Sequence, residues 1–323
     1  GRRAGGRPGA GSGLDMSSLR REAVRVQVPA SSANLGPAFD SAGLALAVYD
    51  EAIAMVTDDP GELVEVVGEG SDTVPRDESH LVVRAMAAAF EWLDVRPTGF
   101  ILRCANTIPH GRGLGSSAAA IVGGIVLARA MVDDGPQRMS DSDVLQVALG
   151  FEPHPDNLSA ALYGSFTIAW LEEDGFADAV RLATHEGLRP VVLIPPDEML
   201  TTRARAMLPA SVPFSDAVLN VSRAGLLVHA MTVDPLRLMS ATADRLHQQA
   251  RAEAFPHSVD LVAALREAGV PAVISGAGPT VLAFAGPELD GLLTTLVGDG
   301  QWQVQRVDVA LHGAREVPLA PLP

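Results

Sequence analysis

Lysine is absent from this sequence of 323 residues, so all 24 of its Lys and Arg positions are arginine. That absence excludes the Walker-A phosphate loop, G-x-x-x-x-G-K-[ST], in which the lysine reaches the β- and γ-phosphates of a nucleotide. If the chain binds phosphate, it has to use backbone N–H groups, a helix dipole, arginine side chains and a metal ion.

Cysteine is almost absent too, since Cys104 is the single one. One cysteine excludes an intrachain disulfide framework and a zinc site built from several thiolates. Cys104 stands in an alternating apolar run, which is typical of a buried structural thiol and not of a nucleophile. The composition fits a reducing compartment, and we expect a cytoplasmic protein.

Positive charge is scarce, because the formal net charge is -15 and the sequence pI is about 4.9. An acidic surface does not attract nucleic acid or an anionic membrane, and no apolar run reaches the length of a transmembrane helix. Residues 1–18 are rich in Gly, Arg and Ser without an apolar core, so we expect a disordered leader and not a signal peptide. We therefore expect neither nucleic acid nor membrane as a partner.

Strands and helices are predicted throughout the rest of the chain, in an order that favours the α+β class. Apolar residues alternate with polar ones over residues 24–28, and Pro29 is expected to end that strand before a loop of small residues over 30–40. The later elements do not alternate strictly, which argues against a doubly wound parallel sheet. Further strands are predicted at 44–56, 62–67, 100–104, 164–171, 190–194, 272–275, 281–284 and 304–309, and helices at 80–92, 116–131, 140–149, 198–207, 215–231, 234–248, 258–268 and 287–297.

A glycine-rich segment, residues 107–120, follows a predicted strand and opens a strongly apolar helix. The first turn of a helix presents unpaired N–H groups and a partial positive charge, so this position suits an anion. Gly111, Gly113 and Gly115 let the backbone approach a phosphate, and Ser116 and Ser117 supply hydroxyls for a phosphate oxygen or Mg²⁺.

The alternative for this segment is a glycine-rich turn with Ser116 as an ordinary N-cap. A run this long, with Pro109 before it, Arg112 within it and two serines at the helix start, favours the phosphate site.

Three ordered motifs resemble the GHMP kinase family. They are the glycine-rich residues 108–119, the segment 29–43 (Pro-Ala-Ser-Ser-Ala-Asn-Leu-Gly-Pro-Ala-Phe-Asp-Ser-Ala-Gly) and the segment 274–280 (Ile-Ser-Gly-Ala-Gly-Pro-Thr). The His-Pro-Asp-Asn segment at 154–157, together with 205–209 and 246–251, is similar to the homoserine kinase branch of that family.

The resemblance implies a two-lobed α+β fold, with a ribosomal S5-like N-terminal lobe and a ferredoxin-like C-terminal lobe. We expect a first lobe at 19–171 that carries the phosphate loop and a second lobe at 172–323. The implied reaction moves the γ-phosphoryl group of ATP to the hydroxyl of L-homoserine in threonine biosynthesis, with Mg²⁺, and a homodimer is expected.

Site residues follow from the same resemblance, position by position. It implies catalytic roles for Asp40, which orients the hydroxyl, and for Ser117, and it implies Mg²⁺ ligation by Ser117 and Glu152. Substrate-binding roles are implied for Asn34, Asp40, His154, Asn157, Arg205 and Arg251. Nucleotide binding is implied for Pro109, His110, Gly111, Arg112, Gly113, Leu114, Gly115, Ser116, Ser117, Ala118, Ala119, Gly276 and Gly278.

Individually these residues also have ordinary structural interpretations. Asn34 and Asp40 are common turn residues, Arg205 and Arg251 suit solvated helix faces, and His154 suits a loop hydrogen bond. Asp156 fits a helix N-cap as well as a pocket wall. The ordered motifs carry the functional interpretation.

Three positions depart from the family's pattern. Ala38 and Pro153 stand where glycine is usual, and Gly150 stands where a Mg²⁺-binding glutamate is expected, four residues before His154. Glu152 is the nearest substitute. Two alternatives therefore stay open: a GHMP kinase for another small alcohol, and a catalytically weak GHMP-like protein that binds an amino acid or nucleotide.

Overall fold

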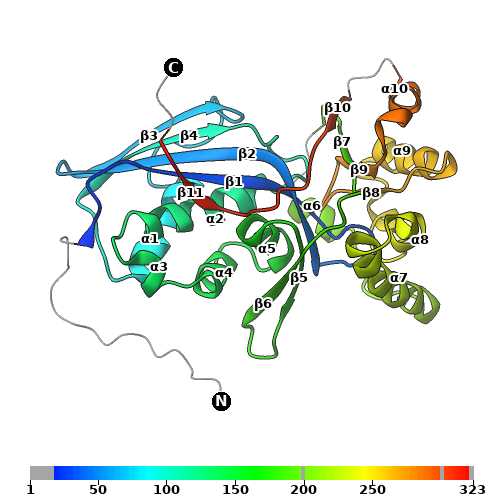
Figure 1. The fold of residues 1–323 in the computed structure, drawn as a ribbon, viewed down its shortest axis with the longest axis horizontal. Helices are drawn as coiled ribbons and strands as arrows, with labels where there is room; N and C mark the ends of the chain where they lie inside the picture. The colour runs from blue at the N-terminus through cyan, green and yellow to red at the C-terminus, as the bar shows by residue number, and fades with distance from the viewer. Residues whose placement is uncertain (1–17, 198–200, 299–301, 320–323) are drawn as a thin grey trace.

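Two separate sheets organise the chain in the computed structural model, which describes residues 18–197, 201–298 and 302–319 (Figure 1). Residues 1–17 of the predicted leader lie outside the described residues. Each sheet has its own helices, and strands do not alternate regularly with helices, so the predicted α+β class is confirmed.

The first sheet has seven strands. They are β1 (Val24–Ala33), β2 (Ala42–Thr57), β3 (Gly61–Gly68), β4 (Gly99–Asn106), β5 (Phe166–Leu171), β6 (Ala177–Leu182) and β11 (Arg315–Val317). Their order is β11-β1-β2-β4-β3, while β5 pairs with β2 and β6 pairs with β5. Only β3 and β4 pair in parallel among these described strands.

The second sheet has four antiparallel strands in the order β10-β7-β9-β8. They are β7 (Pro190–Ile194), β8 (Ala272–Ile274), β9 (Val281–Phe284) and β10 (Gln303–Arg306). Helices separate β7 from β8 and β9 from β10, and β8 and β9 follow one another directly. This connectivity and strand order are those of a ferredoxin-like unit.

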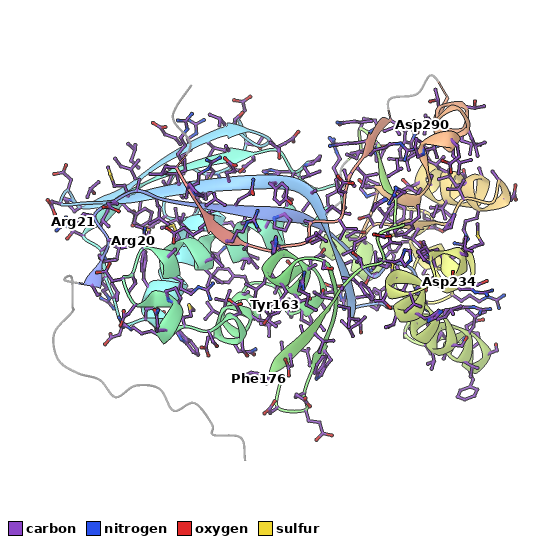
Figure 2. The ribbon with its side chains drawn as sticks, in the orientation of Figure 1. Arg20, Arg21, Tyr163, Phe176, Asp234 and Asp290 are labelled. Atoms are coloured by element: carbon purple, nitrogen blue, oxygen red, sulfur yellow. The ribbon has the colours of Figure 1, made fainter. Side chains whose placement is uncertain are left out.

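Helices cover one face of the first sheet and surround the second sheet (Figure 1). Figure 2 places Arg20 and Arg21 at the end of the molecule opposite Asp234 and Asp290. The helices of the first group are α1 (Leu81–Trp92), α2 (Ser116–Ala130), α3 (Gly135–Arg138), α4 (Asp141–Leu149) and α5 (Pro155–Tyr163), and those of the second are α6 (Thr201–Ala206), α7 (Phe214–Thr232), α8 (Leu238–Ala241), α9 (Pro256–Glu267) and α10 (Asp290–Val297).

α2 is the central helix, and it is buried nearly all round because its sequence is apolar on every face. It packs against α1, α5 and the strands β1 and β2. This packing fixes the start of α2, at Ser116, beside the end of β1. The glycine-rich segment is therefore held next to the loop that follows β1.

Two predictions about local structure are wrong. Pro29 does not end the first strand, because the register shifts by one irregular step between Pro29 and Ala30 and pairing with β2 then continues to Ala33. Such an irregularity lets a strand tolerate a residue that cannot donate an N–H.

The helix predicted over 234–248 is also too long, since regular helix ends at Ala241. The carboxylate of Asp244 accepts hydrogen bonds from the N–H groups of Leu246, His247 and Gln248. A side chain that takes over backbone donors in this way favours a turn over continued helix.

By contrast, the helices predicted over 80–92 and 140–149 are confirmed. The second begins with a capping box, in which the side chains of Ser140 and Asp143 each accept from the other's backbone N–H.

Two pairings bear on how the chain divides into lobes. β5 and β6, on either side of residue 171, pair along their length, and β11 returns from the second half to pair with β1. The division into lobes at 19–171 and 172–323 stays a prediction.

Within the described ranges, no helix has the length and apolar character needed to cross a membrane.

Candidate functional site

The glycine-rich segment makes a tight turn into α2. Gly111, Gly113 and Gly115 have φ values of 64°, 77° and 70°, in the left-handed region that glycine favours. Gly115 is the N-cap of α2, and no side chain caps it. Ser116 is the first helical residue, so the alternative that makes Ser116 the N-cap is wrong. The first turn of α2 is thus available to an anion.

The third motif supports this turn from behind. A Cβ added to Gly113 would lie 2.4 Å from the carbonyl oxygen of Ser275 and 2.9 Å from that of Gly278. The Ser275 hydroxyl lies 2.6 Å from the Gly113 carbonyl oxygen and 2.8 Å from the Ser32 hydroxyl. Ser275 therefore joins the three motifs at one buried point.

A cavity of about 630 Å³ opens in front of the phosphate loop, and we call it the polar cavity. It lies between the loop after β1, the start of α2, the start of α5, α6 and the residues before α9. Most of the residues predicted for the site line it: Asn34, Asp40, Gly111, Arg112, Gly113, Gly115, Ser116, Ser117, Ala118, Glu152, His154, Asn157, Arg205, Arg251 and Gly276.

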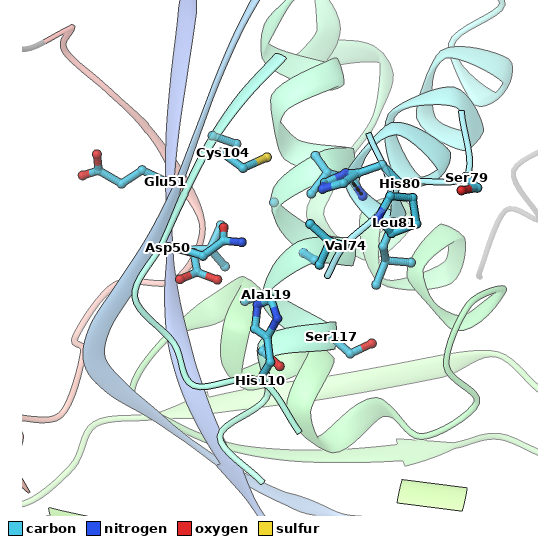
Figure 3. A pocket seen from close by; sticks show the side chains of 18 residues that line it. Asp50, Glu51, Val74, Ser79, His80, Leu81, Cys104, His110, Ser117 and Ala119 are labelled. Atoms are coloured by element: carbon cyan, nitrogen blue, oxygen red, sulfur yellow. Dashed lines mark hydrogen bonds between the residues drawn. The ribbon is translucent and has the colours of Figure 1, made fainter. Parts of the chain in front are cut away.

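A second cavity of about 320 Å³ lies on the other side of the start of α2, and we call it the apolar cavity (Figure 3). Val74 and Leu81 form part of its wall, and His110 and Ser117 lie at its lower end in Figure 3. Ser116 and Ser117 line both cavities. A ligand that runs along the first turn of α2 therefore reaches the cavity beside Val74 and Leu81 at one end and the cavity that holds Asp40 at the other.

Asp50 ties the apolar cavity to the glycine-rich segment. Its carboxylate accepts the N–H groups of Thr107 at 2.7 Å and Ile108 at 2.9 Å. Burial raises the pKa of Asp50 in spite of these two hydrogen bonds, which lower it. The strand β4 is thereby held at the point where the chain turns toward α2.

Asp40 and Arg205 face each other across the polar cavity. The Arg205 guanidinium donates to both carboxylate oxygens of Asp40, in a bidentate ion pair. The guanidiniums of Arg205 and Arg251 each lie 5.3 Å from the centre of the Phe39 ring. Phe39 thus gathers two cations at one wall of the cavity.

Arg251 differs from Arg205 in its surroundings. It is 2% exposed, and its Nε donates to the Ala204 carbonyl oxygen at 3.1 Å. Its Nη1 lies 3.4 Å from the Gly276 carbonyl oxygen. Among the residues that the structure describes, no carboxylate forms an ion pair with it. A buried guanidinium without a carboxylate partner can bind an anion that enters the cavity.

Asn34 is predicted to bind substrate, but its amide is engaged within the protein. Its Nδ2 donates to the Gly276 carbonyl oxygen at 3.0 Å, and its Oδ1 accepts the N–H of Asp40 at 2.9 Å. Asn34 and Asp40 both have positive φ, of 69° and 55°. The amide therefore holds Asp40 in a strained loop conformation.

Three groups from the His-Pro-Asp-Asn region meet at the polar cavity. Burial raises the pKa of Glu152 to about 7 and that of Asp156 to about 7, and burial lowers the pKa of His154. Asp156 lies within the first turn of α5, and His154 is the N-cap, so the N-cap interpretation of Asp156 is wrong. Asn157 accepts a hydrogen bond from Ser31 at 2.9 Å.

Gly150 and Glu152 occupy different positions relative to the polar cavity. Gly150 is the exposed C-cap of α4 and lines neither cavity, whereas Glu152 lines the polar cavity together with Ser117. No group of three or more His, Cys, Asp or Glu able to hold a metal occurs among the described residues. A single carboxylate and a hydroxyl fit Mg²⁺ that takes its other ligands from phosphates and water.

Some predicted residues lie elsewhere, and some lining residues were not predicted. Of the predicted nucleotide residues, Pro109, Leu114 and Gly278 line neither cavity, while His110 and Ala119 line the apolar one. Several side chains that line the two cavities were not predicted from the sequence. Phe39 could have been, because it stands next to Asp40 within the motif at 29–43. The missed residues include Val28, Phe39, Asp50, Val74, His80 and Leu81.

Known proteins match the chain over nearly its whole length. Residues 80–165 match the family GHMP kinases N terminal domain, and residues 229–291 match GHMP kinases C terminal. The homoserine kinase of Streptomyces coelicolor is 50% identical over 303 residues, which covers 94% of this chain and 97% of that protein. The homoserine kinase of Streptomyces avermitilis is 49% identical, with coverage of 94% and 98%.

Solved structures agree with these sequence matches. The crystal structure of homoserine kinase from Cytophaga hutchinsonii has a TM-score of 0.79 at 25% identity, covering 94% of this chain and 100% of that one. A mevalonate kinase from L. major has a TM-score of 0.63 at 13% identity, covering 90% and 97%, and that likeness concerns the fold alone.

Proposed function

The chain belongs to the homoserine kinases of the GHMP kinase family, and on that premise we propose that it transfers the γ-phosphoryl group of ATP to the hydroxyl of L-homoserine. The product is O-phospho-L-homoserine, and the step belongs to threonine biosynthesis. The observation that carries the proposal is the meeting of two cavities at Ser116 and Ser117, one of which holds Asp40, Arg205 and Arg251.

The apolar cavity suits the base of the nucleotide. Its walls combine aliphatic side chains, such as Val74 and Leu81, with the polar groups of Asp50 and His80. The triphosphate would follow the first turn of α2, where uncapped N–H groups and the helix dipole favour negative charge. Since the chain has no lysine, these backbone donors and the Ser116 and Ser117 hydroxyls supply the phosphate contacts.

The polar cavity suits an amino acid with a side-chain hydroxyl. Homoserine carries an ammonium, a carboxylate and a hydroxyl, and the cavity offers Asp40, Arg205 and Arg251. Asp40 and Arg205 pair with each other in the structure. A zwitterion can replace both partners at once, with its carboxylate at Arg205 and Arg251 and its ammonium and hydroxyl toward Asp40. An uncharged alcohol offers no such exchange.

Phosphoryl transfer needs positioning and charge neutralisation more than a strong base. In the transfer, a bond forms between the homoserine oxygen and the γ-phosphorus, the bond from that phosphorus to the β–γ bridging oxygen breaks so that ADP leaves, and the hydroxyl proton is released to water. Asp40 accepts a hydrogen bond from the hydroxyl and orients it. Asn34 holds Asp40 in place, because its Oδ1 accepts the backbone N–H of Asp40. The donors at the start of α2 stabilise charge on the transferred group.

Glu152 and Ser117 are the residues that would hold Mg²⁺. The ion supplies charge neutralisation between the phosphates. Glu152 lines the polar cavity and Gly150 lines neither cavity, so we propose Glu152 as the carboxylate ligand in place of a glutamate at position 150. The position of Glu152 supports an active kinase over a catalytically weak binding protein.

A panel of acceptor alcohols tests the proposal. Purified protein is incubated with Mg-ATP and L-homoserine, mevalonate, shikimate or galactose, and phosphorylated product is followed by ³¹P NMR and by ADP release. We expect product with homoserine and at least hundredfold lower kcat/KM with the other alcohols. Turnover of another alcohol without turnover of homoserine would contradict the proposal.

Two arginine variants make the test specific to the polar cavity. Arg205→Gln should lose about 10²-fold or more in kcat/KM for homoserine, because the variant lacks a charge-assisted contact to the carboxylate. Arg237→Gln is the matched control, since Arg237 forms a surface ion pair with Asp234 and lines neither cavity. Equal losses in both variants would argue against the assigned role of Arg205.

Two further expectations belong to the same proposal. We propose a homodimer in solution, which sedimentation equilibrium measures directly, and a cytoplasmic location, which cell fractionation measures. Neither is needed for the assignment of the reaction.

A further inference from the structure

A cluster of buried polar side chains lies behind the wall of the polar cavity. It consists of Asn220, Asp244 and His247, and the His247 and Asp244 side chains are 1% and 0% exposed. None of the three lines either cavity. Burying polar groups is unfavourable unless they are hydrogen-bonded. The hydrogen-bond partners of this cluster therefore show what it holds in place.

The His247 ring connects two parts of the site. Its Nε2 lies 2.8 Å from the Gly36 carbonyl oxygen, and its Nδ1 lies 3.3 Å from Nη1 of Arg251. A carbonyl oxygen only accepts, so Nε2 carries the proton. A guanidinium only donates, so Nδ1 is unprotonated and accepts. The two neighbours thus fix the neutral Nε2–H tautomer.

At one end, the loop that carries Asp40 anchors the His247 ring. Gly36 and Phe39 belong to that loop, and the Phe39 and His247 rings are 5.0 Å apart. A Cβ added to Gly36, whose φ is 90°, would lie 2.5 Å from the Thr242 carbonyl oxygen. The loop and the segment after α8 are therefore in close contact.

At the other end, His247 holds Arg251. Nε and Nη1 of Arg251 are engaged with Ala204, Gly276 and His247. Nη2 is the remaining guanidinium nitrogen, and Arg251 lines the polar cavity. Because the three contacts fix the plane of the guanidinium, they decide where Nη2 points.

Asp244 in turn fixes His247. It accepts the N–H groups of Leu246, His247 and Gln248, and it accepts Nδ2 of Asn220 at 2.8 Å. The chain at His247 therefore has little freedom to move away from Gly36 or Arg251.

We propose that His247 is a positioning residue for the acceptor substrate: its Nδ1 accepts from Arg251 and aims that guanidinium at the substrate carboxylate, while donation from its Nε2 to Gly36 anchors the imidazole ring. The inference rests on the proposed function for the identity of that substrate. It assigns the residue a role in acceptor binding and none in nucleotide binding.

Two substitutions separate this role from a merely structural one. His247→Gln keeps one donor and one acceptor, whereas His247→Leu keeps neither. We expect the Leu variant to raise KM for homoserine about ten- to hundredfold, the range for a lost hydrogen bond to a charged group. We expect its kcat to change less than threefold and the Gln variant to stay within threefold of wild type in both constants. His229→Leu, at an exposed position of α7, is the matched control.

A substrate without a carboxylate supplies the decisive comparison. 3-Amino-1-propanol keeps the ammonium and hydroxyl of homoserine but gives Arg251 nothing to bind. Its KM should therefore be the same, within twofold, for wild type and His247→Leu. Equal increases in KM for both acceptors, or no increase for homoserine, would overturn the proposal. Absence of homoserine turnover by wild type would instead contradict the proposed function.

A pH profile keeps the test informative if the Leu variant does not fold. Protonated His247 would place an N–H against Arg251, so KM for homoserine should rise at low pH in wild type and rise less in His247→Gln. Burial lowers the pKa of His247, so the rise belongs below pH 6.5, and the charged groups acting on the ring are Asp244, Arg251 and Asp40. Identical profiles in the two proteins would overturn the proposal.

Discussion

Adding one methyl group at Gly113 should damage the phosphate loop far more than the same change at another glycine of similar backbone conformation. The Cβ of Gly113→Ala would lie 2.4 Å from the Ser275 carbonyl oxygen, 2.9 Å from the Gly278 carbonyl oxygen and 3.0 Å from the Gly278 nitrogen. All three are backbone atoms, so no flexible side chain can move aside. Gly269→Ala is the control, with φ of 84° and nothing within 4 Å of the added atom.

The difference between the two variants isolates the steric contact. Both place alanine in the left-handed region, at about 1 kcal/mol each. Only Gly113→Ala adds crowding, for which roughly 1–3 kcal/mol is typical. We therefore expect losses in unfolding free energy of roughly 2–4 kcal/mol for Gly113→Ala and about 1 kcal/mol for Gly269→Ala.

Denaturant unfolding and nucleotide titration measure the two consequences. The unfolding midpoints give the stability difference, and fluorescence titration with Mg-ATP gives the affinity, which should fall at least tenfold in Gly113→Ala and stay unchanged in Gly269→Ala. Equal stability losses in the two variants, or unchanged ATP affinity in Gly113→Ala, would refute the reasoning that the third motif buttresses the phosphate loop.

Three further predictions concern the polar cavity. Ser117→Ala should lower kcat about 10²-fold while changing KM for homoserine less than threefold, because its contact is to phosphate or metal; steady-state kinetics that show unchanged turnover would argue against this role. Glu152→Gln should raise the Mg²⁺ concentration for half-maximal activity about tenfold, and Gly150→Glu should change it less than twofold; the reverse order in a Mg²⁺ titration would restore position 150 as the metal site. Asp156 has a pKa of about 7 in the folded chain against a reference value of 3.8, so wild type loses stability as pH rises between these values. Asp156→Asn lacks this loss, and its stability relative to wild type should rise by about 3 kcal/mol between pH 5 and pH 8, as read from unfolding midpoints at each pH; a constant difference would show that the carboxyl titrates normally.

The phosphate loop was predictable because its signal is local. The three glycines, two serines and apolar run at 111–126 are continuous in sequence, and the turn needs positive φ at each glycine. The lack of lysine alone excludes a Walker-A loop, so phosphate contacts have to come from backbone N–H groups, hydroxyls and arginine. The substrate-binding roles of Asp40, Arg205 and Arg251 were predicted from family resemblance. The three residues line one cavity in the structure although they are far apart in sequence.

The rest depended on tertiary packing. Asp50 lies on β2, Val74 lies before α1, and nothing in their local sequence places them on one wall. The turn at 242–248 was predicted as helix because hydrophobic periodicity carries no information about the Asp244 carboxylate. That carboxylate accepts three backbone N–H groups and so ends the helix. His247 was missed for the same reason, because its role exists only once Gly36 and Arg251 lie on either side of it.

The pairing of β11 with β1 leaves one edge of β1 uncovered during much of translation. β1 (Val24–Ala33) leaves the ribosome long before its partner β11 (Arg315–Val317), and all the other described strands come between them (Figure 1). At roughly 5–20 residues per second, synthesis from the end of α2 to β11 takes roughly 10–40 s. Throughout that interval the outer edge of β1 has unpaired N–H and C=O groups, which can template pairing with another nascent chain. A ribosome stalled before residue 315 therefore holds a chain that has its phosphate loop but also an open strand edge, which β11 has yet to cover.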